Sequence, residues 1–207
     1  MPAYVTARLT FVILALVAAS SACRHRERFD IQYVPSAPPP ASTFRASVFV
    51  QVVDRRPPDR GGIDARRVGW TRGSFNIPKR LRVAENTVAR NVWTATANAL
   101  GQVGIGAGAG SCQLLATVLE FWEDGIGGTG SHVAVRYQLL DPSGRERWSA
   151  TVESGSSARG DPSPPAVAPS ANDGSYGLFD YALAVLAARA RAHFATLAFQ
   201  QAIAYTN

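Results

Sequence analysis

Short stretches of the chain alternate between apolar and polar residues, which is the pattern of β-strands with one buried face. Residues 133–139 follow this pattern, and residues 148–152 continue it after an Asp-Pro-Ser-Gly turn. Residues 44–54 are rich in Val and Phe, which predicts a strand buried on both faces, and residues 112–122 predict a second strand. The pattern therefore predicts four strands.

Two longer stretches carry apolar or small residues three or four positions apart, the spacing of one helix face. The stripe between residues 85 and 103 ends in glycines and consists of Val88, Val92, Ala95, Ala99 and Val103. The stripe of a long C-terminal helix consists of Phe179, Leu183, Leu186, Ala190, Phe194 and Leu197. The order β-α-β-β-β-α predicts an α+β fold, with a single mostly antiparallel sheet and two helices packed on one face.

The N-terminal residues follow neither pattern. Arg8 is the only charge in the first 22 residues, and residues 9–19 form an almost wholly apolar run. A membrane-spanning helix needs roughly 20 apolar residues, so this run is too short for one. A positive start, an apolar run of this length and small residues after it are typical of a secretory signal peptide. We therefore assign residues 1–22 to a signal peptide rather than to a buried N-terminal helix.

The segment Ser20-Ser21-Ala22-Cys23 resembles the lipobox of bacterial lipoproteins, although an aliphatic residue is usual where Ser20 stands. The resemblance implies that Cys23 receives a diacylglyceryl group on its sulfur and becomes the mature N-terminus. Arg24, in place of Asp, then implies retention at the outer membrane with the domain facing the periplasm. Small residues at Ser20 and Ala22 also suit ordinary signal peptidase, so a soluble periplasmic or secreted protein is the alternative.

Beyond Cys23 the composition divides the chain into three parts. Residues 23–43 contain four prolines, which predicts an extended tether between the lipid and the domain. Residues 44–207 are long enough for one small α+β domain with a core. Within it, residues 155–176 form a polar, Pro-rich stretch that predicts a flexible loop. A lipidated Cys23 could not pair with Cys112, so no disulfide is expected.

The net charge of +6 is concentrated in residues 55–82, where nine basic residues face only Asp59 and Asp64. With a single lysine, the arginine count does not by itself indicate nucleic-acid binding. The segment is either a solvated loop or a contact surface for an envelope protein or anionic lipid, since apolar residues lie between the charges. The candidate contact residues are Arg55, Arg56, Arg66, Arg67, Trp70, Arg72, Lys79 and Arg80.

The sequence offers little catalytic chemistry. Residues 125–130 match G-x-G-x-x-G, but a strand follows where a dinucleotide site needs a helix. The chain has no P-loop, G-x-S-x-G, H-E-x-x-H or C-x-x-C motif, and its histidines share no metal-ligand spacing with Cys112. We expect no cofactor, no metal and no enzyme activity. The rival hypothesis is a hydrolase or transferase that uses Cys112 with His132, or the carboxylates Glu120, Glu123 and Asp124.

Several of these segments together resemble the YajG-like family of bacterial lipoproteins and the auxiliary lipoproteins of ABC-type export systems. The resemblance covers residues 44 to 200. It is carried by the strand Val48–Val53 with Asp54-Arg55-Arg56 after it, by Gly69, by Leu119-Glu120-Phe121, and by Gly144 and Trp148 before the long helix. It implies a non-enzymatic accessory protein at the outer membrane and supplies no catalytic residues.

Overall fold

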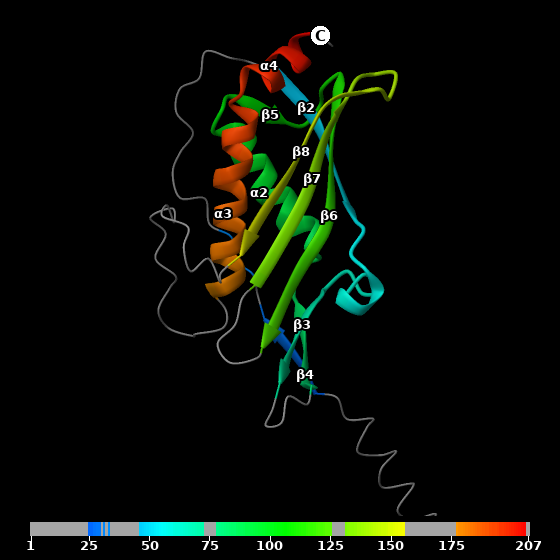
Figure 1. Ribbon diagram of the computed structural model, residues 1–207, viewed down its shortest axis with the longest axis vertical. Helices are drawn as coiled ribbons and strands as arrows, with labels where there is room; N and C mark the ends of the chain where they lie inside the picture. Colours follow the sequence, from blue (N-terminus) through cyan, green and yellow to red (C-terminus); the bar gives the residue numbers. More distant parts are fainter. Residues whose placement is uncertain are drawn as a thin grey trace, which may run out of the picture.

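The computed structural model describes residues 25–29, 31, 33, 46–72, 78–125, 131–155 and 177–205. Within these residues a single eight-stranded sheet organises the chain (Figure 1). Its strands are β1 (His25–Phe29), β2 (Ala46–Asp54), β3 (Arg67–Arg72), β4 (Pro78–Ala84), β5 (Ile105–Ala107), β6 (Cys112–Gly125), β7 (Ser131–Leu140) and β8 (Glu146–Gly155). β6 is central because it pairs with β2, β3 and β7, and the path β1-β4-β3-β6-β2-β5 runs through it.

The sheet is mixed, so the prediction of a mostly antiparallel sheet is wrong. Among the described strands, the parallel pairs are β1–β4, β2–β5, β2–β6 and β3–β6, and the antiparallel pairs are β3–β4, β6–β7 and β7–β8. β2 and β6 are parallel because the intervening chain, which includes helix α2 (Val88–Gly101), crosses back over the sheet before β6 begins. The four predicted strands correspond to β2, β6, β7 and β8, but the antiparallel pairing holds for them only in the meander β6–β7–β8.

Helix α2 and helix α3 (Gly177–Phe194) pack side by side on one face of the sheet (Figure 1). The Thr87 hydroxyl caps α2 by accepting a hydrogen bond from the Arg90 N–H at 3.3 Å. The α+β class predicted from the sequence is therefore confirmed. Among the described residues, no single helix is long and apolar enough to cross a membrane. By length and composition, only α3 together with the following helix α4 (Leu197–Ala204) could do so, and this pair is bent by 67°.

The bend between α3 and α4 corrects the prediction of one uninterrupted C-terminal helix. Thr196 begins the second helix, because its hydroxyl accepts a hydrogen bond from the Phe199 N–H at 3.4 Å. The change of direction places the Phe199 ring 4.6 Å from the ring of Trp148 on β8. Leu197, the last residue of the predicted stripe, is 68% exposed, and the buried side chains of α4 are instead Phe199, Ala202 and Ile203.

Aromatic side chains fill the core between the helices and the sheet. Phe121 of β6 stacks on Phe179 of α3 at a centroid distance of 4.7 Å. The Tyr137 ring meets Phe194 edge-on, and its hydroxyl lies 3.1 Å from the Thr96 hydroxyl. Burial raises the pKa of Tyr137, so this phenol stays neutral and serves as a buried hydrogen-bonding group.

The turn between β7 and β8 has the predicted chemistry. Asp141 accepts hydrogen bonds from the backbone N–H groups of Ser143 and Arg145, at 2.9 and 3.0 Å. Gly144 has a φ of 81°, a conformation that residues with a side chain rarely adopt. The turn therefore fixes the register of the antiparallel pair.

Part of the segment expected to be a tether belongs to the sheet. Residues 25–29 form β1, whose partner is β4, from His25 opposite Arg80 to Phe29 opposite Ala84. Ile31 is buried in the core, and the Tyr33 hydroxyl accepts a hydrogen bond from Asn98 of α2 at 2.5 Å. The signal peptide, Cys23, residues 34–43 and most of the loop at 155–176 lie outside the described residues.

Candidate functional site

The eight residues predicted as a contact face do not share one environment. Arg55 and Arg66 are exposed, and Arg67 and Trp70 are half-buried. Arg56 is only 4% exposed, so its side chain is not available to a partner. The remaining three lie on the strands of a hairpin, Arg72 on β3 and Lys79 and Arg80 on β4, and their side chains are outside the description. Residues 55–82 are therefore a loop followed by two strands, rather than one long loop.

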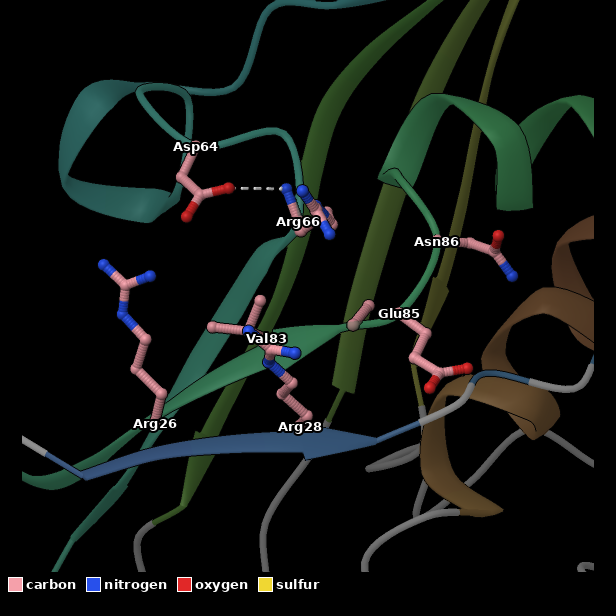
Figure 2. A pocket seen from close by; sticks show the side chains of 8 residues that line it. Arg26, Arg28, Asp64, Arg66, Val83, Glu85 and Asn86 are labelled. Atoms are coloured by element: carbon pink, nitrogen blue, oxygen red, sulfur yellow. Dashed lines mark hydrogen bonds between the residues drawn. The ribbon is translucent and has the colours of Figure 1, made fainter.

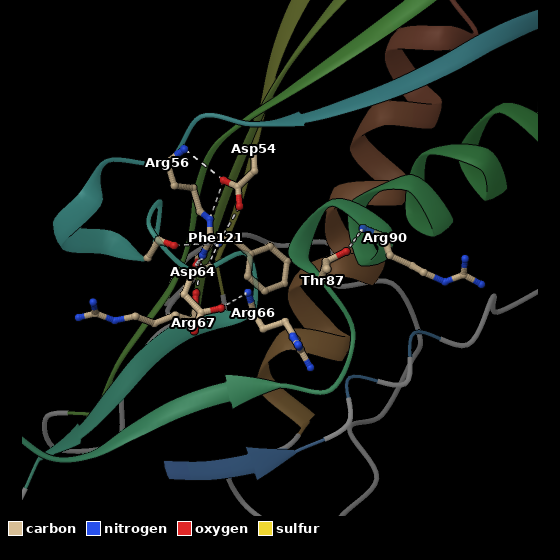
Figure 3. Close-up of polar contacts among 9 residues, drawn as sticks. Asp54, Arg56, Asp64, Arg66, Arg67, Thr87, Arg90 and Phe121 are labelled. Atoms are coloured by element: carbon tan, nitrogen blue, oxygen red, sulfur yellow. Dashed lines mark hydrogen bonds and ion pairs between the residues drawn. The ribbon is translucent and has the colours of Figure 1, made fainter. Parts of the chain in front are cut away.

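Arg56 is a structural hub (Figure 3). Its guanidinium group donates to both carboxylate oxygens of Asp54, at 2.9 and 2.8 Å. It also donates to the backbone carbonyl groups of Arg67 and Phe121, at 2.6 and 3.1 Å. These contacts tie the end of β2 to β3 and β6, so Arg56 positions the basic segment on the sheet.

Arg67 lies over two aromatic rings of neighbouring strands. Its guanidinium carbon is 4.8 Å from the ring centroid of Trp70 on β3 and 5.5 Å from that of Trp122 on β6. Both distances are within the range of cation–π attraction. The arrangement holds the Arg67 charge against the sheet, whereas the neighbouring Arg66 is exposed.

A hollow of about 380 Å³ opens beside Arg66 (Figure 2). Three elements form it: the exposed face of β1, the turn before β3 and the end of β4. Its lining consists of Arg26, Arg28, Asp64, Arg66, Val83, Ala84, Glu85 and Asn86. Arg26 and Arg28 are two residues apart on a strand, which places them on the same face.

Sequence analysis missed Arg26 and Arg28 because it assigned them to the tether. A usable signal was present, since Arg26, Glu27 and Arg28 alternate in charge at strand spacing. That signal is short, and the partner strand β4 lies more than fifty residues further along the chain. Without β4 nothing in the sequence brings these arginines beside Arg66.

The candidate catalytic pair is not assembled. Cys112 begins β6 and is 1% exposed, whereas His132 lies opposite Trp122, near the other end of the same strand. Ten residues of strand separate the two positions along β6, which corresponds to roughly 33 Å at 3.3 Å per residue. Cys112 therefore packs as a small apolar residue in the core, and His132 lies far from it along the strand.

The carboxylates at the far end of β6 diverge as well. Glu120 lies next to a bulge and pairs with His132 at 2.5 Å and with Arg60 at 3.5 Å. Glu123 is buried, at 3% exposure, and the side chain of Asp124 is outside the description. In the described part of the chain, no group of three or more His, Cys, Asp or Glu side chains is placed to hold a metal ion.

Comparison with known proteins finds likeness in fold but not in sequence. No protein-family model matches the chain, and no curated protein matches it. The crystal structure of protein XCC0632 from Xanthomonas campestris, of family DUF330, is similar with a TM-score of 0.57 and 16% identity. That match covers 84% of this chain and 98% of XCC0632.

Two further solved structures are similar over smaller parts of this chain. The PelC dodecamer from Paraburkholderia phytofirmans matches with a TM-score of 0.39 and 16% identity, over 74% of this chain and 92% of that one. Lipoprotein GNA1162 from Neisseria meningitidis matches with a TM-score of 0.28 and 17% identity, over 57% and 88%. The likeness to XCC0632 shows that the chain has this α+β fold. The two lower scores add nothing to that conclusion.

Proposed function

We propose that the protein is a non-enzymatic envelope lipoprotein, anchored at the outer membrane through an acylated Cys23. The observation that carries this proposal is the apolar run of residues 9–19 followed by Ser20-Ser21-Ala22-Cys23. A mature protein with two ester-linked chains and one amide-linked chain would be held firmly, because stable anchoring takes more than one acyl chain. The α+β domain would then face the periplasm as an accessory or binding component, in keeping with the YajG-like and ABC-export resemblance.

The absence of catalysis is part of the same proposal. The separation of Cys112 from His132 along β6 supports it, because a nucleophile and its base must lie within hydrogen-bonding reach. The exposed basic residues of segment 55–82 are the proposed contact surface for another envelope component. Arg56 is excluded from that surface by its burial.

The intact mass of the mature protein, extracted from membranes of a bacterial host, tests the anchor. We expect cleavage before Cys23 and the added mass of a diacylglyceryl group and one acyl chain. The variant Cys23→Ser should carry no lipid and should leave the membrane fraction. Cleavage at the same bond without added mass would contradict the proposal.

The alternative function is a soluble periplasmic or secreted binding protein. The small residues Ser20 and Ala22 favour it, because ordinary signal peptidase accepts them. In that case the mature protein has a free Cys23 thiol, which thiol-specific labelling of the unfolded chain would detect beside Cys112.

A further inference from the structure

The hollow beside β1 concentrates positive charge. It brings together the guanidinium groups of Arg26, Arg28 and Arg66, and among the described residues none of the three forms an ion pair with an acidic side chain. The two carboxylates in the lining, Asp64 and Glu85, lower its formal charge to +1, but neither forms an ion pair with the three arginines among the described residues. Asp64 accepts a hydrogen bond from the backbone N–H of Arg66 at 3.0 Å, and Figure 2 shows the Glu85 side chain directed away from the arginines. Like charges gathered in a concave site attract an anion.

The size and chemistry of the hollow indicate which anion fits. Guanidinium groups present N–H donors in a planar fork that matches the oxygens of a phosphate group. A volume of about 380 Å³ is enough for a phosphate with a small organic group attached. Val83 and Ala84 supply a short apolar wall on one side of it. In a phosphorylated headgroup, the phosphate would contact the arginines and the organic group would contact the apolar wall.

The position of the hollow indicates where the phosphate comes from. β1 begins at His25, two residues after Cys23. Because a residue spans at most about 3.6 Å, the Cα atom of Arg26 lies within roughly 11 Å of the Cα atom of Cys23. The headgroup layer of a bilayer is about 5 to 8 Å deep on each side. If Cys23 is acylated, as in the proposed function on which this step rests, the chain holds Arg26 close enough to the bilayer surface for its side chain to reach the lipid phosphates, and Arg28 follows two residues further along β1.

We propose that the hollow formed by Arg26, Arg28 and Arg66 binds the phosphate of an anionic lipid headgroup in the leaflet that anchors Cys23. The acyl anchor and this site act on the same leaflet. Together they hold the sheet by its β1 edge and restrict how the domain turns on the membrane.

Native mass spectrometry of the full chain, as purified in a nonionic detergent, tests the site with phosphatidylglycerol and phosphatidylcholine as probes. We expect bound phosphatidylglycerol at lower lipid concentration than bound phosphatidylcholine. Arg26→Ala, Arg28→Ala and Arg66→Ala should each weaken phosphatidylglycerol binding about fivefold. Since Arg66 lies outside β1, its variant tests the site even if a change in β1 disturbs that edge strand.

Arg145→Ala is the matched control, because Arg145 is an exposed arginine in the β7–β8 turn at the opposite end of the sheet. It should change the binding less than twofold. Equal binding of the two lipids, or equal loss in Arg145→Ala and Arg66→Ala, would overturn the proposal. Displacement of phosphatidylglycerol by inorganic phosphate at a similar concentration would assign the site to free phosphate and overturn the lipid source.

The lipid-binding experiment and the mass measurement of the anchor can give negative results independently of each other. The detergent assay detects lipid binding whether or not Cys23 is acylated. A lipidated protein without preference for phosphatidylglycerol contradicts only the phosphate site, whereas a mature protein without lipid on Cys23 contradicts the proposed function.

Discussion

Arg56 joins three strands through a single side chain. Its side chain has no exposed surface, and the charge is balanced by Asp54, which is 16% exposed. The guanidinium group also donates to the backbone carbonyl groups of Arg67 and Phe121, and, at 3.4 Å each, to those of Gly61 and Asp64. Removal of a buried arginine of this kind lowers the stability of the fold, because its former partners lose hydrogen bonds at a site that water does not reach.

We expect Arg56→Ala to lower the free energy of unfolding by about 3 to 5 kcal/mol, since it removes the cation that pairs with Asp54 and the donors of four carbonyl groups. Arg56→Lys should also destabilise, because an ammonium group lacks the planar fork that reaches Asp54 and the carbonyls together. Denaturant-induced unfolding measures both. Arg55→Ala, the exposed neighbour, is the control and should stay within about 0.5 kcal/mol of the parent. An effect of similar size at both positions would refute the assignment of Arg56 as a hub.

Asp141 predicts a specific dependence of stability on pH. The Ser143 hydroxyl, the Arg145 and Ser143 N–H groups and the Arg147 guanidinium hold the pKa of Asp141 down at about 2, from an ordinary value of 3.8. A carboxyl group with a lowered pKa stabilises the folded state above its unfolded-state pKa. That stabilisation is lost as the pH falls from about 4 to about 2.

We therefore expect Asp141→Asn to be less stable than the parent at neutral pH, and the difference to shrink as the pH falls through this window. Denaturant midpoints measured at several pH values give the comparison. Asp59→Asn, at an exposed carboxylate, is the control. A difference between Asp141→Asn and the parent that stays constant down to pH 2 would be the contrary result.

At the scale of elements, the sequence predicted those that carry a strong local pattern. The β6–β7–β8 meander and helices α2 and α3 each have a clear period of apolar residues. Asp141 and Gly144 are residues typical of a turn, and they lie between β7 and β8. β1, β3 and β4 were not predicted, because arginines interrupt the alternation of apolar and polar residues in these strands. β3 and β4 pair with each other locally, but β1 pairs with β4 and β3 with β6, more than fifty residues away in the chain. Local periodicity could therefore not reveal the parallel pairs that make the sheet mixed.

The same reason explains why the site was only half predicted. Arg66 was found through the density of charge in residues 55–82. Arg26 and Arg28 were not, because proline content alone assigned residues 23–43 to a tether. Nor could composition separate the buried Arg56 from the exposed Arg55, since the acceptors that surround Arg56 come together only in the folded chain.

The docking of the segment after β1 can be tested with two isoleucines. Ile31 is 4% exposed in the core, whereas Ile63 is 80% exposed. We expect Ile31→Ala to lower the free energy of unfolding by about 2 to 5 kcal/mol, as for other large-to-small changes in a core. Ile63→Ala should change it by less than about 0.5 kcal/mol. Similar small losses in both variants would mean that residues 31–33 are a free tether after all.

At the scale of the whole molecule, the sheet has two distinct ends. β1, β3 and β4 lie at one end, and the β7–β8 turn and α4 lie at the other (Figure 1). β6 alone, with 14 residues, extends roughly 45 Å between them. If Cys23 is acylated, the first end lies at the membrane and the second projects into the periplasm.

Spin labels on the lipidated protein in vesicles would measure this orientation. We expect a paramagnetic lipid headgroup to broaden the electron paramagnetic resonance spectrum of a label at Asn86→Cys, beside the hollow. The spectrum of a label at Ser143→Cys, in the β7–β8 turn, should not change. Cys112 does not interfere, since it is 1% exposed. Equal broadening at the two sites would show that the domain lies flat or tumbles freely.

The parallel pairing of β1 with β4 also has a mechanical consequence. If Cys23 is acylated, a partner that pulls the domain away from the membrane would load the chain at the N-terminal end of β1, along the direction of the strand. Backbone hydrogen bonds loaded in this direction resist together, as in shear, whereas bonds loaded across a strand open one after another, as in a zip. In the acylated protein, β1 would therefore resist tension through its hydrogen bonds to β4, whereas an unpaired flexible tether would transmit the same tension to the core.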